Sequence, residues 1–366
     1  MKVLYDHQIF ALQKFGGISR YFNEIMKMKN EEFEVENIDP VLFDRKEIQV
    51  KQDLFSRGER FIKRKLGVYK AEVVSEFPIE VIDIFSKSNY DILHPTYYDP
   101  YFLEMNKKPF VLTVYDMIHE IYSEYFKIDD PTSRNKLLLC NKASKIIAIS
   151  KKTKDDLVRV FDLPEDKVHV IPLASDFGNV VPIRPEGVAN LNKYILFVGS
   201  RHAYKNFYYP MRALARILKA DKDVSILCTG LKFTSDESQF FESLGIQSQM
   251  HHVFLQSDQE LAWAYSNAAL FIFPSLYEGF GFPMLEAFAS GCPVISSTGG
   301  SLPEVGGDAA IYFDPKNIEE IQLAAQSVLY DSSVKEDLIR RGLHRYKEFS
   351  WTKCRLETAK VYESLF

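Results

Sequence analysis

Short runs of apolar residues alternate with longer amphipathic segments along almost the whole chain. The apolar runs are continuous, which is typical of strands buried on both faces of a parallel sheet. The segments between them have the length and spacing of crossover helices, as in residues 18–26, where apolar side chains recur at i, i+3, i+4, i+7 and i+8. The predicted strands are KVLY (2–5), DILH (91–94), FVLTVY (110–115), KIIAIS (145–150), VHVIP (168–172), YILFVG (194–199), VSILCTG (224–230), HVFLQ (252–256), LFIFPS (270–275) and PVISS (293–297).

The pattern is interrupted once, at residues 174–193, which have two prolines, two glycines and no period. A chain of 366 residues is also long for a single core. The sequence therefore predicts an α/β protein of two doubly wound, Rossmann-like domains, at 1–176 and 190–350, facing a central cleft. An amphipathic segment at 351–366 predicts a terminal helix that packs on a large surface. Ligands of such sheets bind at the carboxyl ends of the strands.

Composition narrows the class of protein. The chain is 46% hydrophobic and 26% charged, with a net charge of −5 and a pI near 6.0, so it offers no general attraction for nucleic acid. Its four cysteines are widely spaced and lack a metal-ligand pattern, which favours reduced core residues. The first residues have no apolar region typical of a signal peptide, and no apolar run reaches the length of a membrane span. We therefore expect a cytoplasmic protein.

The stretch PSLYEGFGFPMLEAFASGCPVI (274–295) contains two glutamates in apolar surroundings, where an unpaired carboxylate is costly. Glu278 follows a predicted strand. We expect a helix that begins at Pro283 and is closed by Gly291, so that its N-terminus lies just past the Gly-Phe-Gly turn and suits a phosphate. Glu286 then falls in the first turn, where it either accepts hydrogen bonds from sugar hydroxyls or simply interacts with the helix dipole.

Two cations follow the strand YILFVG directly. Arg201 and Lys205 stand four residues apart, and both residue types bind phosphate groups. The alternative is a pair of solvated surface cations. The Asp-Lys-Asp sequence at 221–223 lies in a polar helix-to-strand turn, and we interpret it as solvated rather than as a metal site.

Two segments of the first half are candidates for ligand contacts. Gly16 and Gly17 lie between a strand and a helix, where glycines let a backbone approach a ligand, although such a pair is also common in plain turns. They do not form the G-x-G-x-x-G fingerprint of NAD enzymes. The aromatic segment PTYYDPYF (95–102) is suited either to stacking on sugar rings or to core packing. Ser150 is the predicted N-cap of a helix.

Residues 55–70, FSRGERFIKRKLGVYK, are basic and amphipathic. Such a segment lies on an anionic membrane or forms a solvated helix face. The first alternative predicts a peripheral contact with the inner face of the plasma membrane and a lipid-linked acceptor.

The stretch EGFGFPMLEAFASGCPVI resembles the signature of the retaining family-4 glycosyltransferases, which have the two-domain GT-B fold. Their E-x7-E motif matches Glu278 and Glu286. The resemblance implies that Glu278 contacts the transferred sugar at the reaction centre and that Glu286 holds the ribose of a nucleotide sugar. It further implies that Arg201 and Lys205 bind the donor diphosphate. By the same resemblance the terminal helix crosses back to the first domain.

The remaining site residues also follow from the resemblance. The turn Gly279-Phe280-Gly281 borders the donor, the Gly16–Gly17 loop contacts the donor phosphate and the acceptor, and the segment 252–256, with Val253 and Phe254, supplies largely backbone contacts to the base. Many members carry His-Asp at the end of the strand that here reads FVLTVYD. This chain instead has Tyr115 before Asp116, so either Tyr115 or His119 takes the place of the histidine.

The sequence therefore predicts a hexosyltransferase that moves a sugar from a GDP- or UDP-sugar, GDP-mannose among them, to a saccharide or lipid-linked saccharide acceptor with retention. The resemblance places it in surface polysaccharide or lipopolysaccharide biosynthesis. Arg201, Lys205 and the helix end are expected to stabilise the leaving group with no metal and no cofactor beyond the donor. The alternatives are an epimerase or phosphorylase of the same fold and a nucleotide-sugar-binding partner without activity. Neither oligomeric state nor acceptor follows from the residues.

Overall fold

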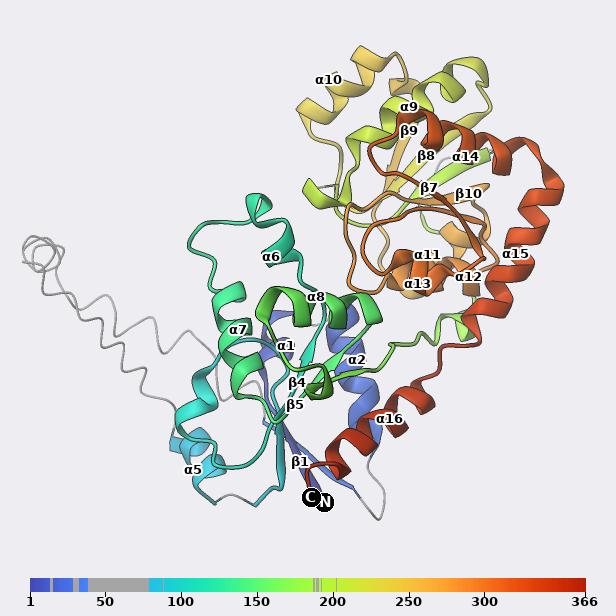
Figure 1. Cartoon of the computed structure of the whole chain (residues 1–366). Coiled ribbons are helices and arrows are strands. Elements are labelled where there is room, and N and C mark those ends of the chain that lie inside the picture. Colours follow the sequence, from blue (N-terminus) through green and yellow to red (C-terminus); the bar gives the residue numbers. More distant parts are fainter. Residues whose placement is uncertain are drawn as a thin grey trace, which may run out of the picture. The chain divides into compact units, whose positions relative to one another are not determined.

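The computed structural model describes residues 1–13, 16–28, 33–38, 79–87, 89–186, 188, 191, 193–201 and 203–366. The chain divides into two compact units. Figure 1 shows the whole chain coloured from its N-terminus to its C-terminus. Unit 1 comprises Met1–Thr113, Arg134–Lys145 and Tyr362–Phe366, and unit 2 comprises Val114–Ser133 and Ile146–Val361. The domain limits expected from the sequence, at 176 and 190, stay a prediction.

Unit 1 is built around a parallel sheet in the order β2-β1-β3. Its central strand pairs Val3 with Val35 on one side and with Ile92 on the other. The edge strand β2 is polar and mostly exposed. The elements of this unit are β1 (Lys2–Tyr5), α1 (Gln8–Leu12), α2 (Gly17–Ile25), η1 (Met26–Met28), β2 (Glu34–Asn37), α5 (Ile79–Lys87), β3 (Ile92–His94), η3 (Tyr101–Glu104), most of β4 (Val111–Val114) and most of α7 (Thr132–Lys142).

A buried polar chain ties the two ends of the sequence together inside unit 1. His94 contacts the hydroxyl of Tyr362 at 2.6 Å through Nδ1 and the hydroxyl of Thr113 at 2.9 Å through Nε2. The Tyr362 hydroxyl also lies 2.8 Å from that of Tyr5. Because Tyr362 belongs to α16 (Trp351–Glu363), the predicted terminal helix exists and its last residues are part of unit 1.

Unit 2 contains the longer run of strands and helices. It begins with α6 (Ile118–Ile121), η4 (Ser123–Tyr125), most of β5 (Lys145–Ala148), α8 (Lys151–Phe161), η5 (Glu165–Lys167), β6 (Val168–Val170) and η6 (Phe177–Asn179). It continues with β7 (Lys193–Phe197), η7 (Ala203–Lys205), α9 (Tyr208–Ala220), β8 (Val224–Thr229), α10 (Ser235–Leu244), η8 (Gln247–Gln249), β9 (Met250–Val253), α11 (Asp258–Ser266), β10 (Leu270–Phe273), α12 (Phe282–Ala289), β11 (Val294–Ser297), α13 (Leu302–Gly306), β12 (Ala310–Phe313), α14 (Ile318–Tyr330), α15 (Ser332–Tyr346) and most of α16.

The main sheet of unit 2 has six parallel strands in the order β12-β11-β10-β7-β8-β9. Counted from β7, this is the order 3-2-1-4-5-6 of the doubly wound dinucleotide-binding sheet, with the reversal between β7 and β10. A further sheet has three strands in the order β4-β5-β6, of which most of β5 and all of β6 belong to unit 2. In such sheets the crevice outside the strand ends at the reversal is the expected ligand site.

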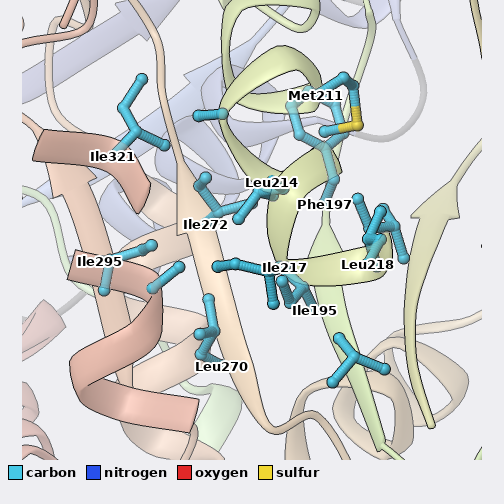
Figure 2. Close-up of a cluster of buried hydrophobic side chains, with 14 of the residues drawn as sticks. Ile195, Phe197, Met211, Leu214, Ile217, Leu218, Leu270, Ile272, Ile295 and Ile321 are labelled. Carbon is cyan, nitrogen blue, oxygen red and sulfur yellow. The ribbon is translucent and has the colours of Figure 1, made fainter. Parts of the chain in front are cut away.

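The four inner strands of the six-stranded sheet, β7, β8, β10 and β11, are almost wholly buried, as their continuous apolar runs predict. Figure 2 shows Leu270 and Ile272 of β10 pointing at Leu214 and Ile217 of α9, in a cluster that also includes a side chain of α14. Phe271 alternates to the opposite face, where α11 packs Tyr265 edge-on against it at 5.3 Å.

All ten predicted strands are found within two residues of their expected limits, with one shift. The predicted strand at 252–256 is β9, which begins at Met250 and ends at Val253, so that Phe254 lies beyond it. The sequence missed β2, whose polar residues hide an edge strand, and β12, whose four residues lack a continuous aliphatic run. Ser150 caps α8 by accepting a hydrogen bond from the Thr153 amide, as predicted.

Candidate functional site

The candidate site of unit 2 lies where β7 and β10 end. These strands are neighbours in the sheet and pair Ile195 with Leu270. The strand order of the sheet reverses between them. The loop after β7 carries Lys205, and the loop after β10 carries Glu278. Two loops that the sequence separates by about seventy residues are therefore brought together, because the carboxyl ends of parallel strands share one edge of a sheet.

Lys205 and Glu278 form the centre of the site. Lys205 Nζ lies 2.7 Å from Glu278 Oε1, and Ser275 Oγ donates to the same oxygen at 2.6 Å. The two charged side chains are 23% and 15% exposed, so the pair is partly shielded yet open to solvent. Burial acts to lower the pKa of Lys205, but the negative charge of Glu278 outweighs it and the pKa is raised. The site therefore holds a firmly charged ammonium.

The turn that carries Glu278, residues 274–281, is irregular but held along its backbone. Asn206 Nδ2 donates to the Pro274 carbonyl at 3.0 Å, and the Ser301 amide donates to the Glu278 carbonyl at 2.9 Å. Gly281 has φ +108°, and a Cβ there would meet Leu302 at 2.9 Å, so glycine is required for both conformation and space. These hydrogen bonds and close contacts fix the backbone that positions the Glu278 carboxylate.

The residues that directly follow β4 pack on the same turn, and both segments belong to unit 2. A Cβ on Gly279 would stand 1.8 Å from the Tyr115 carbonyl oxygen and 2.9 Å from Asp116 Cβ. Asp116 is close enough for its charge to help raise the pKa of Lys205. Its Oδ1 also accepts from the Ile118 amide at 3.0 Å. The predicted residue Asp116 is thus brought to the Lys205–Glu278 pair.

His119 has a different environment. Its ring stacks on Phe126 with centroids 3.8 Å apart, and its Nε2 lies 3.9 Å from Asp130 Oδ2. Phe126 in turn stacks on Tyr204 at 6.4 Å. These contacts favour a role for His119 in packing the loop between α6 and α7. Whether Tyr115 or His119 takes the place of the family histidine stays a prediction.

Arg201 is already paired in this structure. Its Nε donates to Glu237 Oε1 at 2.6 Å, and one Nη donates to Glu237 Oε2 at 3.2 Å and to the Lys232 carbonyl at 3.0 Å. Burial opposes ionisation of Glu237, but the hydrogen bonds from Arg201 prevail and hold its pKa below the usual range. Glu237 also completes the capping box of α10 with Thr234. The expected role of Arg201 in binding the donor diphosphate stays a prediction. It requires the Arg201 guanidinium to bind the diphosphate as well as Glu237.

Glu286 lies farther along α12 than expected. The helix begins at Phe282, with Pro283 second, and no acidic residue lies in its first turn, so the prediction that Glu286 occupies that turn is wrong. Glu286 sits one turn later, is 8% exposed, and accepts from the buried hydroxyl of Tyr265 at 3.4 Å. Gly291, with φ +65°, follows the end of the helix as predicted.

The other predicted residues fall in three places. Gly16 and Gly17 are at the N-terminus of α2 in unit 1. Val253 is buried at the end of β9, and Phe254 after it is 65% exposed. Phe280 is buried between Phe282 and Phe349, at centroid distances of 5.8 and 5.7 Å, so its side chain serves packing. The basic segment 55–70 lies outside the described residues.

Sequence reasoning missed three contributors to the site. Ser275 shares Glu278 with Lys205, Glu237 pairs with Arg201, and Tyr204 places its ring 5.1 Å from Lys205 Nζ. Ser275 lies three residues before Glu278, and Tyr204 directly precedes Lys205. Both could have been proposed from the sequence as polar neighbours of the predicted residues. Glu237 was not, since only its capping motif, Thr234 followed three residues later by glutamate, is visible in the sequence.

Two features are absent from the described part of the chain. None of the helices traced in it is long and apolar enough to cross a membrane. Across these same residues, histidine, cysteine and carboxylate side chains nowhere gather in groups of three that would hold a metal ion.

Comparison with known proteins identifies relatives over most of the sequence. The model "Glycosyltransferase Family 4" matches residues 15–177, and "Glycosyl transferases group 1" matches residues 183–345. The chain is 29% identical over 283 residues to O-antigen chain mannosyltransferase B of Escherichia coli, covering 74% of this chain and 73% of that protein. It is 31% identical over 224 residues to MMP alpha-(1->4)-mannosyltransferase of Mycolicibacterium hassiacum, covering 60% of this chain and 54% of that one.

Solved structures agree on the fold. Sucrose-phosphate synthase from Thermosynechococcus elongatus matches 100% of this chain and 99% of its own, with a TM-score of 0.74 at 18% identity. Anabaena HepE in complex with UDP-glucose matches 100% of both chains, with a TM-score of 0.71 at 16% identity. The fold is therefore the GT-B fold, with a Lys–Glu pair at the reversal point of its six-stranded sheet. Taken with the two matching models, this means that the chain belongs to glycosyltransferase family 4.

Proposed function

We propose that the protein transfers mannose from GDP-mannose to a saccharide acceptor with retention of anomeric configuration. The observation that carries this proposal is the cluster of Lys205, Glu278 and Ser275 at the reversal point of the sheet. A charged ammonium and a carboxylate on adjacent strand ends suit the two halves of a nucleotide sugar, which are an anionic diphosphate and a ring of hydroxyls.

Lys205 supplies the main electrostatic contribution. As the bond between the anomeric carbon and the diphosphate oxygen breaks, negative charge grows on the departing diphosphate. An ammonium whose pKa is raised stays charged throughout the pH range of activity. In the resting site this charge is directed at Glu278, and on donor binding it is shared with the diphosphate. Arg201 joins it by sharing its guanidinium with Glu237. With these cations in place, we propose that no divalent ion is required.

Glu278 holds the sugar that moves. Its carboxylate has one oxygen engaged by Lys205 and Ser275, and the backbone of its turn is fixed by hydrogen bonds. It therefore orients sugar hydroxyls beside the anomeric carbon. The acceptor oxygen attacks from the face that the diphosphate leaves, and its proton passes to a diphosphate oxygen. Glu286 accepts from the ribose, and residues 253–254 contact the base.

The choice of mannose rests on the relatives' names, which describe mannosyltransferases. UDP-glucose, the ligand in the HepE complex, represents the alternative donor class. Those names also favour a saccharide acceptor in surface polysaccharide assembly over an epimerase, a phosphorylase or a binding partner without activity. A peripheral membrane contact through 55–70 and a cytoplasmic location belong to the same proposal.

The test measures donor use directly. The protein is incubated with GDP-mannose or UDP-glucose, with methyl α-mannoside as the acceptor probe, and released nucleoside diphosphate and new disaccharide are quantified with and without EDTA. We expect GDP release and an α-linked product, with rates unchanged by EDTA. Consumption of UDP-glucose alone would correct the donor. Loss of transfer in EDTA would overturn metal independence, and turnover of neither donor with this acceptor probe would overturn the proposed function.

A further inference from the structure

The turn that carries Glu278 also forms hydrogen bonds with side chains of α8 and of the segment after β4, all within unit 2. The Tyr277 hydroxyl donates to Asp156 Oδ2 at 2.8 Å. Thr153 Oγ1 donates to the Gly279 carbonyl at 3.4 Å, and the Tyr122 hydroxyl donates to the Leu276 carbonyl at 3.2 Å. The residues on both sides of Glu278 are thus held by a helix that supplies nothing to the Lys205–Glu278 pair itself.

Asp156 is a firmly fixed acceptor. Its side chain is fully buried, and it receives Lys152 Nζ at 2.9 Å and an Nη of Arg159 at 2.8 Å besides the Tyr277 hydroxyl. Burial opposes its ionisation, but these hydrogen bonds prevail and its pKa is lowered. A buried carboxylate is costly unless it is paired. One of the hydrogen bonds that pair Asp156 comes from Tyr277, the residue before Glu278.

The same helix holds the other side of the turn. Glu304 of α13 accepts from the Lys151 and Lys152 amides at the N-terminus of α8, at 2.8 and 3.1 Å. Ser301, three residues before Glu304, donates its amide to the Glu278 carbonyl at 2.9 Å. The turn is therefore connected to α8 by two sets of hydrogen bonds, one through Tyr277 and one through residues 301–304.

We propose that Asp156 is a positioning residue for the transfer reaction, which acts through Tyr277 to fix the direction of the Glu278 carboxylate. Tyr277 and Glu278 are consecutive, and their side chains are tied to different partners, Asp156 and Lys205. A change in the backbone angles of Tyr277 therefore moves the Glu278 carboxylate relative to the ammonium. This inference rests on the proposed function, since it presumes that Glu278 orients the sugar.

The experiment compares Tyr277→Phe and Asp156→Asn with wild type, using the nucleotide sugar that wild type consumes and methyl α-mannoside. Tyr277→Phe deletes only the hydroxyl and leaves Asp156 with its two cations. We expect kcat to fall about tenfold to hundredfold, which is about 1.4–2.8 kcal/mol at 1.36 kcal/mol per tenfold. The KM for the donor should change less than about twofold, because uniform binding is untouched. The double variant should lose no more than the worse single one, because both act through one bond.

Arg159→Met is the matched control, because it removes another partner of the same carboxylate but leaves the Tyr277 bond. It should keep the wild-type kcat. If Tyr277→Phe and Asp156→Asn lose only thermal stability, with an unchanged kcat per folded molecule, Asp156 is structural and the inference is overturned. Glu278→Gln separates the two levels: full activity in that variant overturns the proposed function, whereas its inactivity beside an active Tyr277→Phe overturns only the role of Asp156.

Discussion

Replacing Lys205 by alanine removes the cation that lies 2.7 Å from Glu278 in the loop after β7. At the observed 2.7 Å, two unit charges in an effective dielectric of about 20 attract by about 6 kcal/mol. Much of this attraction is offset by the cost of desolvating both groups. Glu278 keeps a hydrogen bond from Ser275, so the loss of stability should be modest, about 1–3 kcal/mol.

The loss in turnover should be larger than the loss in stability. Removing one preorganised group that stabilises transition-state charge costs about 2.7–4 kcal/mol, or about 10²–10³ in kcat. The assay is the initial rate of nucleoside diphosphate release at saturating donor, together with thermal unfolding of the same samples. Lys205→Arg keeps the charge and should retain more activity than the alanine variant.

The double variant Lys205→Ala/Glu278→Gln separates the two effects. It removes both charges of the pair, so it should regain much of the thermal stability lost in Lys205→Ala because no lone carboxylate remains. It should stay inactive, since neither the diphosphate nor the sugar regains its partner. Wild-type release rates in Lys205→Ala would refute the reasoning, and so would recovery of activity in the double variant.

Two further predictions concern packing and pH. Gly279→Ala places a methyl group 1.8 Å from the Tyr115 carbonyl, so we expect a loss of about 1–3 kcal/mol in stability and of most transfer activity. Gly291→Ala meets only a 3.8 Å contact, but its φ of +65° costs about 1 kcal/mol of stability, so it should lose stability and retain activity. Equal activities of the two variants would contradict this. Burial lowers the pKa of His94 to about 3, so the unfolded chain binds more protons below pH 6.5 and stability should fall by about 2 kcal/mol between pH 6.5 and 5. Urea unfolding at the two pH values measures it, and a His94→Gln variant with the same pH dependence would show that another group is responsible.

The fold was largely predictable from the sequence because its strands are buried on both faces. Runs such as 194–199 and 270–275 are continuous and apolar, which identifies parallel strands without any knowledge of their order. The strand β2 was hidden, because an exposed edge strand such as Glu34–Asn37 needs no apolar residues. The doubly wound class was predicted, but the order 3-2-1-4-5-6 and the register of the strands come from the structure.

The sequence identified individual residues of the candidate site, but it did not show which of them form pairs. Glu278 and Lys205 were visible because each ionisable residue follows a buried strand, and their 2.7 Å contact is a property of the strand order. Arg201 was visible in the same way, but its bond to Glu237 depends on where α10 begins, which is set by tertiary packing. Asp156 carried no signal, because an aspartate among lysines on a helix reads as a solvated residue.

The bond between Tyr5 and Tyr362 joins residues 357 positions apart, inside the compact unit that contains the first strand. During vectorial synthesis on the ribosome, this unit cannot reach its final packing until Tyr362 has emerged, although its first strand appears at the outset. His94 and Tyr5 lack their Tyr362 partner until the chain has grown by 268 residues beyond His94. The order of maturation is therefore inverted: the lobe whose chain begins first is completed last.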